Sequence, residues 1–332
     1  MLIAHIPFVS FTNPDSAKHQ TDNLHALYDI LGDRPALGLT GHTHTTENIE
    51  PGEHYKGWEK ATGTGPAHFH QIIAGAVSGA WWAGDLNDEG VPHGTQRHGS
   101  PRGFYELAFD GSAYVDTYQT FGSSADAQFH SSFNSPRFRR WAERLFRYRD
   151  LHTRGFKRKP LVTVNDLDDI NMLTTADLKD GTWAVVNVWN GSRSTQVEIT
   201  LNNDTTLVAK RTQEGDGEAK RKGLKFSDPY ALMKQATQGR VGFASTVDGN
   251  KTAGFSAWRG TVWAGNPGPF YRWMLTDSSP HLWRVGLPAD LSIGIHRMLI
   301  RVTDRHGRVF ERQRVFEVVE SLPEFNWQGA KW

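Results

Sequence analysis

The first forty residues alternate apolar and polar positions in a pattern that predicts strand, helix and strand. Residues 2–9 form a short apolar run that ends in His-Ile-Pro and predicts a buried strand. Apolar side chains then recur at helical spacing: Leu24, Leu27, Tyr28 and Leu31. Asp22 can cap this helix and Gly32 can end it. Residues 36–40 predict a second strand that runs into Gly41. Such a unit is a parallel crossover, so both strands should end at the same edge of a sheet.

Beyond a polar, glycine-rich passage at 45–66, the periodicity becomes that of short strands joined by tight turns. Three hairpins are predicted: 104–109 with 113–118 around Asp110-Gly111, 183–189 with 195–201 around Asn190-Gly191, and 296–302 with 308–318 around 304–307. These strands favour an antiparallel β-sandwich. A helix near 136–150 interrupts them, with Phe138, Trp141, Leu145 and Tyr148 on one stripe. The charged stretch 213–225 predicts a loop.

Composition narrows the classes of function. The 332 residues include 37 basic and 36 acidic side chains, so charge gives no reason to expect nucleic acid or an anionic membrane as a partner. The chain has no cysteine, which excludes disulfides, thiolate metal sites and a cysteine nucleophile. That lack would suit an exported bacterial protein but does not define the compartment. Neither a transmembrane segment nor a signal peptide is predicted.

The most distinctive chemistry lies at the predicted sheet edge. The motif Gly41-His42-Thr43-His44 follows the second strand, and side chains two residues apart on an extended backbone point to the same face. Gly41 allows the chain to turn closely past whatever the imidazoles bind. His5 ends the first strand and should approach them if the two strands are neighbours. The three imidazoles predict one half of a binuclear metal centre.

These residues resemble motifs of the calcineurin-like metallophosphoesterases. His5-Ile6-Pro7 is similar to the lone histidine that ends a strand in that family, and Gly41-His42-Thr43-His44 is similar to its Gly-His-x-His motif. The block from Ala74 to Asp85, continued at 98–104, resembles the C-terminal domain of a bacterial subgroup in which a β-rich domain follows the catalytic core. The closing strands between 283 and 307 are also similar.

The resemblance implies hydrolysis of a phosphoester by two bound ions of Mn, Fe or Zn, which activate a hydroxide to attack phosphorus. Carried over by position, His5 and His42 match ligands of one ion, and His44 matches a ligand of the other. The implied substrate is a small phosphoester or a phosphorylated envelope component. Whether it is a monoester or a diester, and which metals are native, stay open.

The remaining ligands of the family come from Asp-x-His, Gly-Asp and Gly-Asn-His motifs ahead of the lone histidine. Only four residues precede His5 here, Gly84-Asp85 lies inside the β-rich block, and no Gly-Asn-His occurs. We therefore expect an incomplete metal site, in a chain that is an N-terminally truncated piece of a larger phosphoesterase. Alone it should have little or no hydrolase activity.

Other polar residues near these motifs are candidates for substrate contacts. His68 and His70 repeat the spacing of the metal motif and could reach the catalytic mouth, or they could belong to an interdomain loop. Asn48 and Glu47 follow the motif closely and could support its ligands, and Asn48 is also a candidate substrate contact.

Several patterns admit a structural interpretation beside a functional one. Trp81 and Trp82 could stack on a sugar or a base, or divide between a core and an interface. The acidic cluster at 85–89 could bind calcium or form a solvated turn. The basic stretch 137–159 could guide an anionic substrate or form a solvated helix face.

Taken together, the sequence predicts an α+β, mostly β protein. Residues 1–66 correspond to the tail of the four-layer α/β metallophosphoesterase domain, 67–322 to a β-sandwich-like C-terminal domain, and 323–332 to a tail. The shortened sheet should expose a flank, which would leave the N-terminal segment marginally stable. The alternative function is a β-sandwich module that binds a glycan or another cell-envelope component. The oligomeric state is left open.

Overall fold

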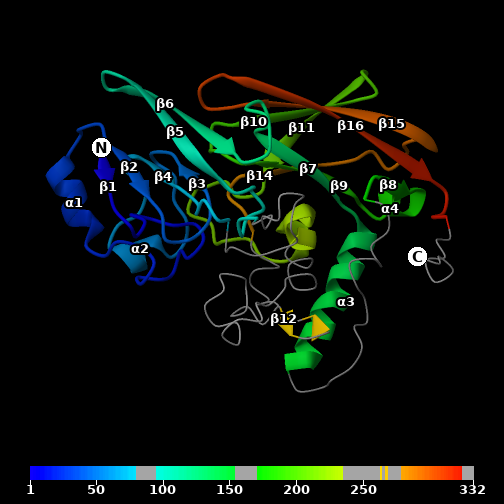
Figure 1. Cartoon of the computed structure of the whole chain (residues 1–332), viewed down its shortest axis with the longest axis horizontal. Helices are drawn as coiled ribbons and strands as arrows, with labels where there is room; N and C mark the ends of the chain where they lie inside the picture. Colours follow the sequence, from blue (N-terminus) through cyan, green and yellow to red (C-terminus); the bar gives the residue numbers. More distant parts are fainter. Residues whose placement is uncertain (80–94, 154–169, 235–261, 264–265, 268–277, 324–332) are drawn as a thin grey trace.

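The computed structural model describes residues 1–79, 95–153, 170–234, 262–263, 266–267 and 278–323. Figure 1 shows a small α/β part at the N-terminus beside a large, mostly antiparallel sheet, which agrees with the predicted α+β, mostly β class. Within these ranges no helix is long and apolar enough to cross a membrane. The predictions for Trp81, Trp82 and the acidic cluster at 85–89 lie outside the described residues.

The N-terminal part is a four-stranded sheet of order β1-β2-β4-β3. Its elements are β1 (Leu2–Ile3), α1 (Leu24–Leu31), β2 (Leu37–Thr40), β3 (Glu47–Ile49), α2 (Trp58–Thr62) and β4 (His70–Ile73). β1 and β2 are parallel neighbours joined through α1, as the pattern predicted. The N-cap of α1 is Asn23 rather than Asp22, because Asn23 adopts the left-handed conformation with φ 55° that turns the chain into the helix.

The apolar faces of these elements share one core. It includes the fully buried side chains of Phe11, Leu24, Tyr55, Trp58 and Ile73. β1 lies at the edge of the sheet, and 72 % of Ile3 is exposed there. The boundary at residue 66 remains a prediction, and β4 beyond it pairs within this N-terminal sheet.

A sheet of eight strands carries the second core. Its order is β7 (Phe129–Asn134), β9 (Trp183–Val188), β14 (Leu282–Gly286), β11 (Thr205–Arg211), β10 (Gln196–Leu201), β15 (Gly294–Thr303), β16 (Val309–Val319) and β8 (Met172–Thr174). Arg312 and Arg314 of β16 donate hydrogen bonds to the carbonyls of Phe129 and Ser131 in β7. The sheet is therefore curled so that its first strand lies against its second-last one. The predicted sandwich thus takes the form of one curled sheet around a shared core.

Two of the three predicted hairpins are confirmed and one is wrong. β5 (Gly103–Asp110) pairs with β6 (Ala113–Thr120), and β15 pairs with β16. β9 and β10 are not partners, because β14 and β11 lie between them in the sheet. A two-residue hairpin at Asn190-Gly191 would need positive φ at both residues, and neither has it. Gly191 instead allows close packing, since a Cβ there would lie 2.6 Å from the Trp283 ring.

The remaining elements surround the curled sheet. They are α3 (Pro136–Thr153), α4 (Thr175–Lys179), the 3-10 helix η2 (Leu224–Phe226), β12 (Val262–Trp263) and β13 (Asn266–Pro267). In α3 the predicted stripe of Phe138, Trp141 and Leu145 is buried and packs with Leu232. The side chain of Tyr148 lies outside the described part.

Candidate functional site

Parallel pairing of β1 and β2 brings His5 and His42 together. Ile3 is paired with Leu39, and the N–H of Gly41 donates to the carbonyl of His5 at 3.1 Å. The imidazoles lie beyond this last bond, with Nε2 of His5 3.1 Å from Nδ1 of His42 and the ring centroids 5.0 Å apart. The crossover predicted from the sequence is thus the element that positions both rings.

The backbone of the Gly-His-x-His motif differs from the extended form assumed for it. His42 has φ 69° and His44 has φ 55°, both in the left-handed region that non-glycine residues rarely adopt. Each such residue costs about 1–3 kcal/mol, and residues of this kind cluster at functional sites. The two histidines therefore leave the strand through a strained turn rather than from one face of a straight strand.

A third imidazole, which the sequence reasoning missed, completes a row. Nδ1 of His19 lies 2.7 Å from Nε2 of His42. His19 stands on a loop held by Gln20, whose amide donates to the carbonyls of Asn13 and Pro14. A lone histidine in a polar loop carries no spacing signal that could have revealed it. Partial burial, followed by the charges of His19, His5 and His44, lowers the pKa of His42.

The donor set by itself does not fit a dinuclear metal centre. Each ring nitrogen of His42 faces a different imidazole, so the three rings form a row instead of converging on one point. Across the described residues, no group of three or more histidine or carboxylate side chains is placed to hold a metal ion. An Asp-x-His sequence does occur at Asp304–His306, but His306 lies 2.8 Å from Asp116 in a different cluster. No chemical step is therefore assigned to a metal here.

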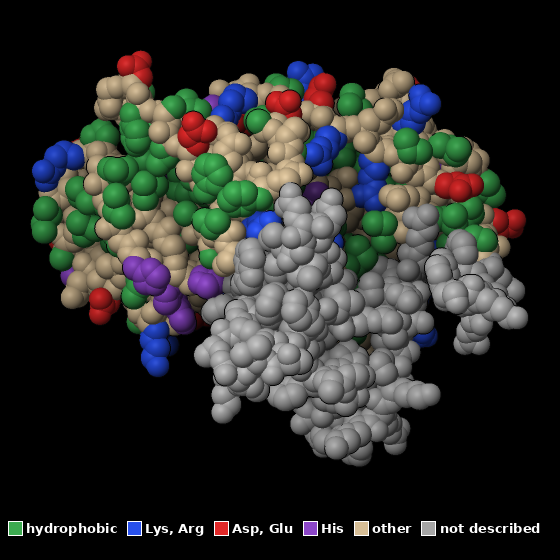
Figure 2. All heavy atoms as spheres, in the orientation of Figure 1, with side chains coloured by type: hydrophobic (Ala, Val, Ile, Leu, Met, Phe, Trp, Pro, Cys, Tyr) green, Lys and Arg blue, Asp and Glu red, His purple; other side chains and the backbone are tan. Residues whose placement is uncertain are grey.

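An open cleft of about 900 Å³ lies beside the histidine row. Its lining residues are Thr12, Asn13, Pro14, Asp15, Ser16, His19, His42, Thr43, His44, Lys56, Arg97, Ala219, Lys220 and Lys222. Figure 2 shows histidine side chains gathered on this face of the N-terminal part. The lining combines four Lys or Arg side chains with a single carboxylate, Asp15. Such a lining attracts anions.

Glu47 is buried beneath the cleft and fixes one of its walls. Its carboxylate accepts hydrogen bonds from the N–H groups of Phe11 at 2.7 Å and Thr12 at 3.1 Å. Burial raises the pKa of Glu47, although Thr12 and Phe11 act to lower it. These contacts join Glu47 to the wall that contains Thr12, and its support of the metal-motif histidines stays a prediction.

The structure places Asn48, His68 and His70 away from the cleft lining. His70 is paired with Leu37 at the start of β2, whereas His42 follows the end of that strand. Its Nε2 lies 2.6 Å from the side-chain oxygen of Asn48, and both residues are buried. Burial lowers the pKa of His70 to about 4. His68 is exposed and stacks on Tyr28 with ring centroids 3.8 Å apart. A substrate role for these three residues stays a prediction.

The described start of the basic stretch 137–159 packs against neighbouring elements. Arg137 lies 3.8 Å from the carboxylate of Asp177, and Arg139 donates to the carbonyls of Asn134 and Gly181. These contacts fasten α3 to the rest of the protein. Guidance of an anionic substrate by this helix stays a prediction.

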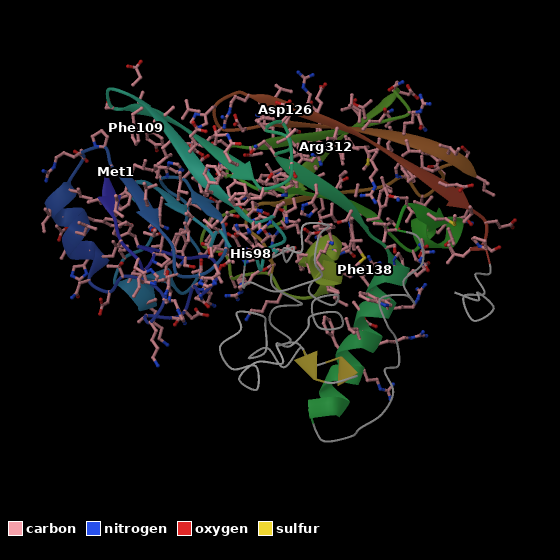
Figure 3. All side chains as sticks on the ribbon, in the orientation of Figure 1. Met1, His98, Phe109, Asp126, Phe138 and Arg312 are labelled. Carbon is pink, nitrogen blue, oxygen red and sulfur yellow. The ribbon has the colours of Figure 1, made fainter. Side chains whose placement is uncertain are left out.

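Figure 3 labels His98, which lies where the N-terminal part meets the curled sheet. Its Nε2 is 3.4 Å from the hydroxyl of Thr12, and its carbonyl accepts a hydrogen bond from Asn187 of β9 at 2.6 Å. A fully buried residue thus joins the cleft wall to the sheet. The two parts of the chain build the cleft together.

Comparison with known families agrees with this architecture. Residues 71–248, more than half of the chain, match the family described as C terminal of Calcineurin-like phosphoesterase. The chain belongs to this family. The matched segment contains Arg97 and the 219–222 part of the cleft lining, while the histidine row precedes it. No curated protein and no solved structure matches the chain significantly.

Proposed function

We propose that this chain provides histidine ligands and the anion-binding walls of a metal-dependent phosphoester hydrolase. The observation that carries the proposal is the row His5–His42–His19 beside a cleft with four cationic side chains. Cations of this kind bind phosphate oxygens, and neutral imidazole is a ligand for Mn, Fe and Zn. Membership of the phosphoesterase family supports the same assignment.

By their match to the family motifs, His5 and His42 would ligate one ion and His44 the other, although the rings of His5, His42 and His19 form a row that does not converge on one metal in this structure. Among the described residues no group of three or more histidine or carboxylate side chains is placed to hold a metal ion, and we propose that a second polypeptide supplies the acidic ligands. The chain's own contribution is then to present imidazoles and to bind and orient the phosphoester.

Metal titration of the full chain tests the incomplete site. With Mn²⁺ or Zn²⁺, calorimetry should show no pair of tight sites, and any weak binding should be lost in His42→Ala. His25→Ala is the matched control, because His25 is an exposed histidine of α1. Two tight ions per chain would overturn the incomplete-site part of the proposal.

Hydrolysis of p-nitrophenyl phosphate and bis-p-nitrophenyl phosphate with Mn²⁺ tests the proposed hydrolase activity. The chain alone should turn over little of either substrate. Activity should appear when the chain is co-expressed with a polypeptide that carries the Asp-x-His, Gly-Asp and Gly-Asn-His motifs. It should then be lost in His42→Ala and kept in His25→Ala. A folded, co-purified pair without activity on either ester would refute the hydrolase assignment.

The alternative of a glycan-binding module gains no comparable support. The side chains of Trp58, Trp141, Trp189 and Trp283 are buried rather than arranged as a platform. The predictions for Trp81 and Trp82 lie outside the described residues, and the exposed rings of Phe104, Phe109 and Phe121 stay compatible with such a module, whereas the family match favours the phosphoesterase. We therefore propose the phosphoester hydrolase.

A further inference from the structure

The charged stretch 213–225, predicted only as a loop, forms one wall of the histidine cleft. Its backbone is paired with the segment before α2. The N–H of His54 donates to the carbonyl of Gly215 at 2.8 Å, and the N–H of Lys56 donates to that of Glu218 at 3.0 Å. The N–H of Gly217 returns a bond to His54 at 2.8 Å. The loop is therefore attached to the part of the chain that carries the histidines.

The same loop is also stabilised internally. The carboxylate of Glu218 accepts the backbone N–H groups of Glu214, Gly215 and Asp216 at 2.7, 2.9 and 2.8 Å. Arg221 donates to the carbonyl of Thr212 at 3.0 Å. These internal bonds fix the backbone of the loop before a ligand arrives, which lowers the entropic cost of ordering it on binding.

The cations on this wall face the cleft beside those from two other segments. Nζ of Lys220 donates to the carbonyl of Thr12 at 3.1 Å and lies 5.0 Å from the centre of the Phe11 ring. Lys222, two residues along the same loop, also lines the cleft, and Lys56 and Arg97 line it from other segments. Among the described lining residues, four side chains are cationic and Asp15 is the one carboxylate, a difference of +3 before any histidine is protonated (four cations minus one carboxylate).

The size and character of the cleft indicate what kind of anion it fits. A volume of about 900 Å³ is at the upper end of pockets that hold drug-sized ligands, far more than one phosphate group fills. Apart from the imidazoles, the described lining has no aromatic side chain, and its apolar members are Pro14 and Ala219. The carbon stems of the lysines add apolar surface to that of Pro14 and Ala219, so the charge of the lining is what would distinguish one ligand from another. A polar ligand with more than one anionic group would match the lining.

We propose that the cleft selects small phosphoesters that carry a second anionic group, and that the 213–222 loop with Lys56 binds that second group. The inference rests on the proposed function, because the first anionic group is the phosphoester that the proposed hydrolase would cleave. Binding of the second group depends only on the cations of this chain and needs no metal.

Non-hydrolysable phosphonates test the selectivity in metal-free buffer. Calorimetry on the full chain compares methylenediphosphonate, methylphosphonate and phenylphosphonate, which differ in a second anionic group or an added aromatic ring. Methylenediphosphonate should bind at least about tenfold more tightly than the other two, and the difference should shrink as salt is raised. Equal affinity for the three probes, or tightest binding of phenylphosphonate, would overturn the proposal.

Charge-neutral variants locate the binding group. Lys56→Gln and Lys222→Gln should each weaken methylenediphosphonate binding about twofold to fivefold, as expected for an exposed charge pair, and should change methylphosphonate binding less. Lys60→Gln and Lys210→Gln are matched controls, because both lysines are exposed and outside the cleft lining. All four lysines are exposed, so folding should be retained and is verified by circular dichroism. Equal losses in cleft and control variants would refute the assignment.

The two proposals fail in different ways. If the reconstituted pair hydrolyses p-nitrophenyl phosphate but the chain does not distinguish the phosphonates, the hydrolase stands and the selectivity falls. If the phosphonates are distinguished as expected but no activity appears, the anion site stands and the hydrolase falls.

Discussion

The buried ion pair between Glu53 and Arg211 should control both the stability of the protein and the shape of the cleft. Glu53 precedes α2 and is fully buried, while Arg211 ends β11 with its side chain 7 % exposed. Their charged groups are 2.9 Å apart. The 213–222 loop packs directly on this pair, since a Cβ on Gly215 would lie 2.5 Å from Cγ of Glu53. Removing one partner should therefore disturb the wall that carries Lys220 and Lys222.

The expected loss of unfolding free energy on removing one partner is set by the burial of the charge left behind, and not by the attraction between the two charges alone. At 2.9 Å the Coulomb attraction is about 6 kcal/mol for an effective dielectric constant of about 20, and desolvation of both charges offsets most of it. Burial acts to lower the pKa of Arg211, but Glu53, Tyr55 and Glu50 together outweigh burial and raise that pKa. Arg211→Met leaves Glu53 buried and unpaired, which should cost about 3–5 kcal/mol of unfolding free energy. Glu53→Gln should cost a similar amount.

A double-mutant cycle by urea denaturation checks this reasoning. The double variant Glu53→Gln/Arg211→Met should lose less than the sum of the single variants by at least about 1.5 kcal/mol, because neither charge is left alone. Arg193→Met is the control, since its ion pair with Asp216 is exposed and should contribute less than about 1 kcal/mol. Single losses no larger than that control, or strict additivity, would refute the argument.

Three further outcomes follow from the described packing. Burial lowers the pKa of His70 to about 4 and of His281 to about 3, so the unfolded chain binds more protons between these values and about 6.5. Stability should then fall as pH drops from 6.5 towards 4, by about 1.4 kcal/mol per pH unit for each group, and a flat urea midpoint over this range would contradict it. Gly99→Ala should destabilise by more than Gly122→Ala in thermal melts. Both glycines have positive φ, but only at Gly99 would a Cβ meet buried atoms at 2.7–2.8 Å. Ile300→Ala should cost about 2–5 kcal/mol in urea, because its side chain is 1 % exposed in the sheet core, and a loss below 1 kcal/mol would show a more adaptable core.

The parts that the sequence predicts well are those in which local pattern and tertiary structure agree. The crossover of β1, α1 and β2 is predicted because a helical stripe lies between two apolar runs. Parallel pairing of the two strands then places His5 beside His42. The β5–β6 and β15–β16 hairpins are predicted because their partners are adjacent in the chain.

The errors arise where packing between distant segments decides the structure. Asn190-Gly191 has the composition of a hairpin turn, yet Gly191 is required by the ring of Trp283, nearly a hundred residues away. His19 joins the histidine row because its loop is held by Gln20. Neither relation leaves a periodicity or a spacing in the sequence.

Under the proposed function, the cleft makes the β-rich part of the chain a component of the phosphoester-binding site. The histidines lie within the first 44 residues, whereas the 213–222 loop and Arg97 belong to the segment that matches the C-terminal family. The backbone bonds between 54–56 and 215–218, and the ion pair of Glu53 with Arg211, hold these two sources of side chains against each other. Under the proposed function, the domain that binds the second anionic group is then not the one that provides the metal ligands. In the reconstituted pair, replacement of loop lysines should therefore alter which phosphoester is preferred, while replacement of His42 should abolish hydrolysis of every phosphoester.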